Sequence, residues 1–349
     1  SSPSRCATPT RAPPGSRARS SRARSSCSRR EGCAVSSPEP LVGRVERLVA
    51  MRSFPGWSEL PTRDLVTLAA IARPRRIGVG EQVFTEGQPI QTVLLVLEGE
   101  LALSRGGKRL GLYRESSGVG GLAAFARDPR GYDCLATRDS VVLELHAEDL
   151  EELFEDRFPI LLAVIRELAR ENVELRRRLP PSAGFPTRSS AGDQCPAQAL
   201  DLVERIFFLR RTLAFGAGRI DSLAELAKGA EEIRAEPGRV VWKVGDRADD
   251  ALAIVCGTLR CRTEDGLAFE LGAGDLAGGL DALGQVPRWY SAEVGEGLVA
   301  LSMGRDLTVD VWEDHPDLAL EVLQAFAAGL LALLERAAEA PPPSFPTIP

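Results

Sequence analysis

The sequence predicts a mainly β fold: two tandem antiparallel β jelly-roll domains with flanking helices, each followed by a long C-terminal helix. A glycine motif followed by a Pro-Arg pair occurs twice, at a constant offset of 158 residues and without a gap. In both copies, short apolar runs alternate with glycine turns, which is typical of antiparallel sandwiches and barrels. The register holds over more than seventy residues, which marks a duplicated domain.

The two copies of the motif are Gly120-Gly121-Leu122-Ala123 with Arg130, and Gly278-Gly279-Leu280 with Arg288. The same offset relates positions before and after the motif, namely Gly87 and Gly245, Leu94 and Leu252, Gly99 and Gly257, Leu101 and Leu259, and Leu143 and Leu301. We therefore expect the two copies to superpose through their strands when residues are paired at this offset.

Apolar periodicity predicts the elements in order. Residues 41–71 read as helical, with Thr62 as a helix N-cap after Pro61. Between Arg76 and Leu145 we expect strands at 83–84, 93–97, 101–103, 110–112 and 141–143, with turns at 80–81, 86–87, 98–99 and 106–107. After Asp149 the helical pattern returns and continues to Leu179. The second copy repeats this order with helices at 199–232, strands at 240–301 and a final helix at 318–338.

The composition divides the chain into five segments. We expect a disordered Ser/Arg-rich arm at 1–38, a first jelly-roll domain at 41–179, a Pro/Ser/Gly-rich linker at 180–196, a second domain at 197–338, and a Pro-rich tail at 339–349. A chain of 349 residues, 44% hydrophobic and 26% charged, has room for two such cores.

The distribution of charge along the chain limits the classes of partner that we expect. The net charge is -6 although eight arginines fall in residues 1–30, so the folded part is acidic and gives little electrostatic reason to bind nucleic acid. The arginine-rich arm is either a solvated tail or a contact to nucleic acid or an acidic membrane. We find no run of about eighteen apolar residues and no secretory signal, and so expect a cytoplasmic protein without a membrane span.

Seven cysteines without zinc-type CxxC pairs predict reduced thiols. The alternative, iron–sulfur ligation by Cys6, Cys27 and Cys33, has poor spacing. We expect no metal site and no cofactor.

The predicted order of elements is helices, a jelly roll carrying GEQVFTEG, LVLEGELAL and GVGGLAAFARDPRGYDCLA, and then a long helix. This order resembles the cyclic nucleotide-binding domain. This domain is the sensor module of the catabolite activator protein and of cyclic-nucleotide-gated channels and kinases. The resemblance covers residues 45–179 and, more faintly, 200–338. It implies that residues 120–133 are a phosphate-binding cassette and that cAMP or cGMP is the ligand. A glycine turn and a short helix would present N–H groups to the phosphate, and Arg130 or Arg288 would close on it.

Both copies depart from the family pattern. The family's ribose-binding glutamate is replaced by Gly121 and Gly279, and the residues after the arginine are Gly131-Tyr132-Asp133 and Trp289-Tyr290-Ser291. Each lost charge-assisted hydrogen bond costs about 1.5–3 kcal/mol. Arg130 and Arg288 therefore either hold an anionic ligand or pair with a carboxylate or loop carbonyls in a module that has lost its ligand.

The long helices carry apolar stripes with heptad-like spacing, Leu161, Ile165, Leu168, Asn172, Leu175 and Leu179 in the first and Leu323, Phe326, Leu330, Leu333 and Ala337 in the second. In the family this helix makes the dimer. We expect either a pseudo-dimer within one chain, in which the two helices pack together, or a homodimer. The alternative is that each stripe covers its own jelly roll.

These observations favour a non-enzymatic regulatory protein that senses a small anionic ligand and acts on a protein partner through its helices. A ligand-free scaffold that presents a surface to a partner is the alternative. No helix-turn-helix follows either long helix, which disfavours DNA binding. Only two histidines, His146 and His315, are present, without a nucleophile–base pairing, so an enzyme is disfavoured.

Overall fold

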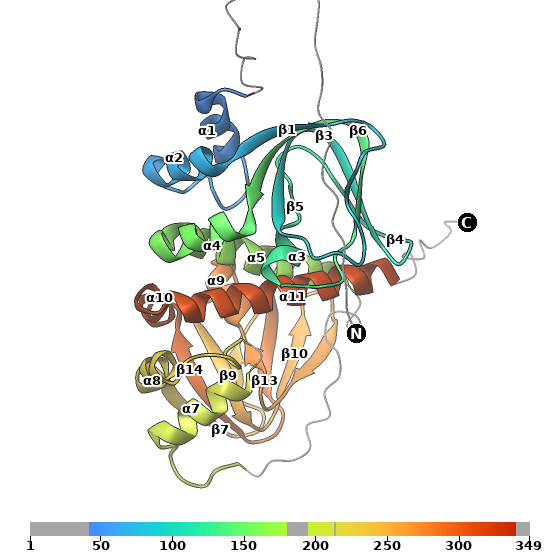
Figure 1. Ribbon diagram of the computed structural model, residues 1–349. Coiled ribbons are helices and arrows are strands. Elements are labelled where there is room, and N and C mark those ends of the chain that lie inside the picture. The colour runs from blue at the N-terminus through green and yellow to red at the C-terminus, as the bar shows by residue number, and fades with distance from the viewer. Residues whose placement is uncertain (1–41, 180–194, 213, 340–349) are drawn as a thin grey trace, which may run out of the picture. The chain divides into compact units, whose positions relative to one another are not determined.

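The computed structural model describes residues 42–179, 195–212 and 214–339 (Figure 1). The predicted arm at 1–38 lies outside the described residues, as do the predicted linker except residues 195 and 196 and the predicted tail except residue 339. Cys6, Cys27 and Cys33, the alternative iron–sulfur ligands, also lie outside them.

Helices precede and follow the first sheet: α1 (Arg44–Arg52), α2 (Thr62–Ile71), α4 (Ala147–Asp156) and α5 (Phe158–Arg178). The region predicted as helical at 41–71 is therefore two helices. Thr62 is the first helical residue rather than the cap, because Pro61 takes the N-cap position. A proline at this end of a helix costs little, since the first N–H groups have no partner within the helix.

The first sheet is antiparallel throughout. It consists of β1 (Arg73–Ile77), β2 (Gln82–Phe84), β3 (Thr92–Arg105), β4 (Lys108–Tyr113), β5 (Gly118–Val119) and β6 (Asp133–His146). The order is β1-β6-β3-β4, with β2 also on β6 and β5 also on β3. Leu94, Val96 and Leu101 of β3 are buried in its core. The mainly β fold with flanking helices is confirmed.

The turn predicted at residues 98–99 is wrong, because β3 continues through it. The ladder between β3 and β6 shifts register on both sides of Glu98, so the strand bends without reversing. Gly99 has φ +97°, and a Cβ there would lie 2.2 Å from Ser140 Oγ on β6. Glycine is required at this bulge because a side chain would collide with the neighbouring strand.

The second half of the described chain repeats the order of elements. The strands are β7 (Glu231–Ala235), β8 (Val240–Trp242), β9 (Asp250–Cys256), β10 (Leu259–Thr263), β11 (Ala268–Leu271), β12 (Leu276–Ala277), β13 (Tyr290–Val294) and β14 (Leu298–Gly304). They form two four-stranded antiparallel sheets, β11-β10-β13-β8 and β12-β9-β14-β7. The helices are α7 (Leu202–Arg211), α8 (Ile220–Gly229), α10 (Arg305–Asp314) and α11 (Pro316–Glu339).

Two elements of this half were not predicted. β7 begins at Glu231, inside the region expected to end a helix, and α10 follows β14 directly. α10 contains Thr308, Val309 and Val311, which are β-branched and weak helix formers. Burial of Thr308, Val311 and Trp312 stabilises the helix instead, and this contribution of packing is not visible in local sequence.

Cys195 and Cys256 form a disulfide bond, so the prediction of reduced thiols is wrong for this pair. They are 61 residues apart in sequence, with Cα atoms 5.4 Å apart, which lies in the usual range for a disulfide. No spacing motif signals a pair this far apart. Cys134 and Cys261 are buried and unbonded.

The long helices α5 and α11 pack together. Leu168 of α5 and Phe326 and Leu330 of α11 belong to one buried apolar cluster. Asn172 in the α5 stripe donates hydrogen bonds to Leu168 O at 2.8 Å and to Phe326 O at 3.4 Å, so its amide bridges the two helices.

Each long helix also enters the strand core of the other half. Leu331 of α11 is buried with β3 and β6 residues of the first sheet, and Val173 of α5 is buried with β9 and β13 residues. The 158-residue offset relates Val173 to Leu331. Figure 1 shows α11 (red) running beneath the short helix α3 (Gly121–Phe125) toward β4. The contact between the halves is therefore reciprocal.

By length and hydropathy, α11 could cross a membrane. Half of its apolar window is buried inside the fold, and the core helix of a globular domain passes the same test. The burial of Leu323, Leu330 and Leu331 accounts for its apolar character without a membrane.

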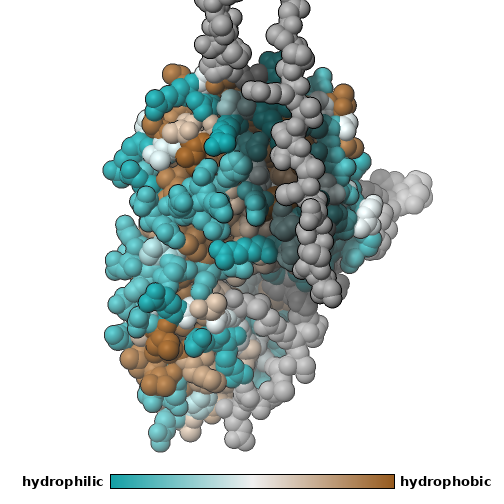
Figure 2. Space-filling view, in the orientation of Figure 1, coloured by the Kyte–Doolittle hydropathy of each residue, from teal (hydrophilic) through white to brown (hydrophobic). Residues whose placement is uncertain are grey.

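Apolar side chains are also exposed on α7 and α8. Figure 2 shows hydrophobic surface low in the view, where these helices lie. Val203, Phe207 and Ile220 are exposed there. The 158-residue offset relates Val203 to Val45 of α1, which is also exposed.

Candidate ligand-binding sites

The first cassette begins at a glycine that no other residue can replace without strain. Gly120 has φ +95° and caps α3 (Gly121–Phe125), which follows β5. A Cβ on Gly120 would lie 2.1 Å from Thr92 O. The Gly120 N–H donates to the Tyr132 hydroxyl at 2.8 Å. The Tyr132 hydroxyl therefore already accepts the hydrogen bond that the Gly120 amide would donate to a phosphate.

The other cassette residues lie beside this glycine. Gly121 stands next to Val93 and Phe125, with ordinary van der Waals room for a Cβ. Leu122 packs at the edge of the apolar core, and Ala123 is buried among the strands. The structure therefore brings Gly120, Gly121, Leu122 and Ala123 together at one short helix.

Arg130 is exposed and paired with two carboxylates. Its side chain is 59% exposed. It donates to Asp128 through Nε at 3.0 Å and through Nη2 at 2.9 Å. Its Nη2 also lies 3.0 Å from Glu335 Oε1 of α11. The side-chain hydrogen bonding that Arg130 donates to Asp128 raises the pKa of Arg130 above its ordinary value.

A second arginine, not predicted from the sequence, completes this cluster. Arg105 at the end of β3 is only 9% exposed and lies 3.0 Å from Asp128 Oδ2. Its Nε donates to Gly131 O at 2.7 Å, and its Nη1 bonds Glu335. Burial opposes ionisation of Asp128, but the hydrogen bonds from Arg130 hold its pKa below the ordinary value. Four charged groups therefore meet at the cassette, two of each sign.

The end of α11 covers this site. Leu331 and Leu334 close a small cavity whose other walls include Gly120, Leu122 and Tyr132. Its volume of about 20 Å³ has room for one water molecule. Lys108 Nζ on β4 lies 3.0 Å from Glu339 Oε1 at the last residue of the helix. A nucleotide does not fit beside Gly120 while α11 lies there.

The second cassette has the same backbone and the same tyrosine. Gly278 has φ +72° and caps α9 (Gly279–Gly284). Its N–H donates to the Tyr290 hydroxyl at 2.9 Å. Gly279 is buried at the start of α9, and Leu280 packs on the apolar core. The two cassettes therefore share one local design.

Arg288 is buried, in contrast to Arg130, and it contacts Trp242, Asp250, Gly278 and Asp281, all in its own half of the chain. Its side chain is 1% exposed and lies 4.2 Å above the Trp242 ring. Nη1 donates to Gly278 O at 2.9 Å, while Nη2 donates to Asp250 O at 2.8 Å and to Asp250 Oδ1 at 2.6 Å. This arrangement matches the alternative in which the arginine pairs with a carboxylate and loop carbonyls.

A buried carboxyl group adds to this arrangement. Asp281 on α9 is 1% exposed, and its Oδ2 lies 3.8 Å from Arg288 Nη1. Burial raises the pKa of Asp281 to about 7, although Arg288 opposes the shift. The position of a bound anion is therefore occupied by the chain's own negative groups.

Side chains of α5 reach the second cassette as those of α11 reach the first. Val173 is buried in the apolar core of the second half of the chain, among residues of β9 and β13. Burial lowers the pKa of the Arg176 guanidinium to about 10. The residue 158 positions before Glu335 is Arg177, so α5 brings a cation where α11 brings a carboxylate. The two sites thus differ in the charge that the covering helix supplies.

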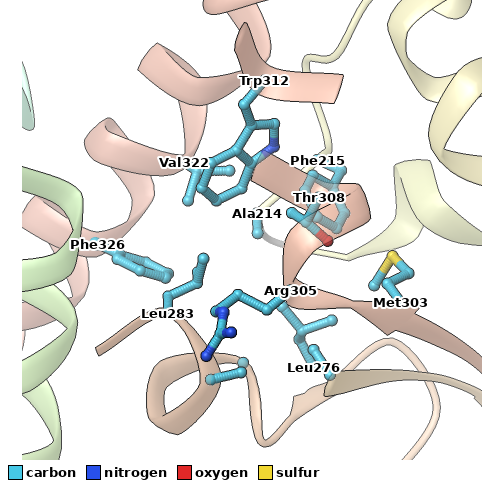
Figure 3. A pocket seen from close by; sticks show the side chains of 13 residues that line it. Ala214, Phe215, Leu276, Leu283, Met303, Arg305, Thr308, Trp312, Val322 and Phe326 are labelled. Carbon is cyan, nitrogen blue, oxygen red and sulfur yellow. The ribbon is translucent and has the colours of Figure 1, made fainter. Parts of the chain in front are cut away.

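Two further hollows lie among the described residues. Figure 3 shows a pocket of about 20 Å³ enclosed by Phe215, Leu283, Trp312, Val322 and Phe326, which is apolar and too small for a nucleotide. A cleft of about 1300 Å³ runs along α5 and is lined in part by Glu167 and Glu171. Arg170, Arg177, Arg178 and Arg288 also line this cleft, so groups of both signs face it. Among the described residues, no group of three or more His, Cys, Asp or Glu side chains is placed to hold a metal ion.

Residues 74–157 match the family model of the cyclic nucleotide-binding domain. The match runs from β1 to the end of α4 and includes the first cassette. It confirms a cyclic nucleotide-binding domain in the first half of the chain. A search of curated proteins finds no significant match.

Solved structures with similar folds include three of different kinds. A cAMP-bound protein named PfPKA-R is 12% identical, over 78% of this chain and 85% of that chain, with a TM-score of 0.33. The regulatory subunit of a cAMP-independent protein kinase A from Trypanosoma brucei is 16% identical, over 78% and 89%, with a TM-score of 0.31. The N-terminal domain of a transcriptional regulator from Streptomyces coelicolor is 25% identical, over 34% and 88%, with a TM-score of 0.31.

Proposed function

We propose that this chain is a non-enzymatic regulatory protein with two cyclic nucleotide-binding-like modules, of which only the first senses an anionic ligand. Module 1 is residues 41–179, module 2 is residues 197–338, and residues 180–196 join them. The family match within residues 74–157 supports the assignment of module 1. The repeated order of strands and the matching cassettes support that of module 2.

The contrast between the two cassette arginines carries this proposal. Arg130 is 59% exposed, and one of its two carboxylate partners comes from another element, α11. Arg288 is 1% exposed and is held by groups of module 2 itself. A ligand phosphate can replace the Glu335 carboxylate on Arg130, because Glu335 reaches the site from α11. Replacing the partners of Arg288 would leave Asp281, which is 1% exposed, in a buried site beside a new negative charge.

We further propose that the chain is an internal counterpart of the family's dimer. The packing of α5 on α11 and the insertion of each helix into the other module's core support this arrangement. A ligand in module 1 would then act on module 2 and on a protein partner through α11. The cytoplasmic location stays a prediction, and the Cys195–Cys256 bond removes the support that it drew from reduced thiols.

A thermal-shift screen tests the proposal. A ligand that binds only the folded protein raises the melting temperature by mass action. We expect cAMP or cGMP to raise it for wild type and not for Arg130→Ala. The control is Arg138→Ala, because Arg138 is an exposed arginine on β6 outside the cassette. No shift for wild type with any cyclic mono- or dinucleotide at millimolar concentration would contradict the sensing role.

The second candidate function is a ligand-free scaffold. The observation that favours it is that each cassette amide is already bonded to a tyrosine hydroxyl and each arginine to carboxylates of the same chain. A scaffold predicts no saturable nucleotide binding by wild type, and no effect of Arg130→Ala on capture of a protein partner.

A further inference from the structure

Glu335 is the only one of the four charges at the first cassette that lies on α11. Arg105, Asp128 and Arg130 belong to β3 and to the cassette loop. The Glu335 carboxylate bonds Arg105 Nη1 and lies 3.0 Å from Arg130 Nη2. Two arginines therefore hold one carboxylate in the manner in which they would hold one phosphate.

The charge balance of this cluster points to a class of ligand. With Glu335 in place, two guanidinium groups face two carboxylates and the site is neutral. Removal of Glu335 leaves Arg105 and Arg130 against Asp128 alone, a net charge of one positive unit. A ligand with a single negative charge, such as a cyclic phosphodiester, restores neutrality. A phosphomonoester with two negative charges does not, and burying its second charge is unfavourable.

The last turns of α11 both block the first cassette sterically and neutralise its arginines. Leu331 is 2% exposed and lies in the core of module 1, while Leu334 lines the cavity beside Gly120. A ligand that reaches the cassette must therefore displace both the carboxylate and the apolar side chains of the last turns of α11.

We propose that Glu335 is a built-in competitor for the ligand of module 1, and that Arg105 is a second anion contact beside Arg130. This inference rests on the proposed function. The ligand is a singly charged cyclic phosphodiester, and its binding releases residues 331–339 of α11 from module 1. Module 2 has no equivalent device, because Arg288 is neutralised by Asp250 and Asp281 rather than by α5.

The test compares Glu335→Gln with wild type by calorimetric titration of cAMP, which carries one negative charge. Glutamine keeps the size of the side chain and removes the charge, so the competing ion pairs with Arg105 and Arg130 are lost. We expect affinity for cAMP to rise about 10- to 100-fold, the value of one charge-assisted hydrogen bond. Arg105→Ala in the Glu335→Gln background should reverse the gain.

The matched control is Glu174→Gln. Glu174 also pairs with an arginine on a long helix, at 2.5 Å from Arg178, but it lies on α5 and its side chain is 54% exposed. We expect no change in cAMP affinity beyond about twofold, since surface ion pairs contribute little. Circular dichroism melts of each variant check that the fold persists.

Hydrogen–deuterium exchange supplies a readout that a merely structural role would not change. In the proposed mechanism, cAMP increases exchange of amides 331–339 while it protects residues 118–133. Adenosine 5′-monophosphate, with two charges, should bind more weakly than cAMP and release the helix less.

The outcomes separate the inference from the function. If wild type binds cAMP and Glu335→Gln binds it no better, the sensing role stands and the competitor role of Glu335 is overturned. If binding leaves exchange at 331–339 unchanged, the release of α11 is overturned. If neither wild type nor Glu335→Gln binds any cyclic nucleotide, both proposals fail. Binding by Glu335→Gln alone supports the competitor role of Glu335 and contradicts the sensing role of the wild-type protein.

Discussion

At the scale of single residues, the two cassettes share a glycine turn and a tyrosine but hold their arginines differently. Arg130 and Arg288 occupy equivalent positions, and each is neutralised by the protein. The arginines differ in how deeply they are buried: Arg288 is 1% exposed beside Asp250 and Asp281, whereas Arg130 is 59% exposed and is reached by Glu335 from α11. In the proposed function, this accessibility decides which arginine can exchange its partner for a ligand.

Asp281 gives module 2 a pH dependence of its own. Its folded-state pKa of about 7 lies above the ordinary value of 3.8, so the folded protein keeps a proton that the unfolded chain releases. The free energy of unfolding should therefore fall as the pH rises between about 4 and 7, by up to about 1.4 kcal/mol per pH unit. Asp281→Asn should lose this component in urea melts at several pH values. Asp310→Asn, at an exposed position on α10, should follow wild type; identical pH profiles for all three proteins would refute the role of Asp281.

Gly120 tests the backbone of the first cassette. Gly120→Ala introduces a Cβ 2.1 Å from Thr92 O at φ +95°, whereas Gly80→Ala at φ +82° meets nothing within 4 Å. Both variants carry the strain of a left-handed backbone, and only the first adds a collision. We expect Gly120→Ala to lower the free energy of unfolding by about 1–3 kcal/mol more than Gly80→Ala in chemical denaturation. Equal losses would mean that the cassette glycine is an ordinary turn residue.

The sequence repeat predicted the positions of Gly120, Gly278, Arg130 and Arg288, because a fixed offset preserves local structure. It could not predict Arg105 or Glu335. These two residues are 230 positions apart, and their contact depends on how α11 crosses module 1. Local pattern contains no information on such a crossing. The heptad-like stripe on each long helix showed only that some apolar face needed cover.

At the scale of elements, α11 serves two cores at once. One part of its apolar surface packs on α5, and Leu331 enters the strand core of module 1. Glycine turns mark the ends of several strands, as at Gly87 and Gly245, whereas β1 and β7 were not predicted. Gly99 shows the limit of that signal, since a glycine of positive φ within a strand permits a bulge as readily as a turn.

Leu331 tests whether α11 is part of module 1. Leu331→Ala should lower the free energy of unfolding by about 2–5 kcal/mol, because it empties a fully packed site. Val203→Ala on α7 is the control, since Val203 is 74% exposed and its loss should change stability by no more than about 0.5 kcal/mol. A similar, small effect of both substitutions would show that α11 does not occupy the core of module 1.

For the whole molecule, the two modules form one unit through reciprocal exchange of their long helices. Val173 and Leu331 are related by the repeat, and each is buried in the opposite core. The exchange is symmetric in shape but not in charge, because α11 presents Glu335 where α5 presents Arg177. In the proposed function, module 1 is the sensor and module 2 is its rigid counterpart.

The number of cyclic nucleotides bound by each chain tests this division of roles most directly. Titration calorimetry of cAMP or cGMP into the intact protein should give one site per chain, with binding lost in Arg130→Ala and retained in Arg138→Ala. Two sites per chain would contradict a structural role for module 2. One site that persists in Arg130→Ala would contradict the assignment of the ligand to module 1.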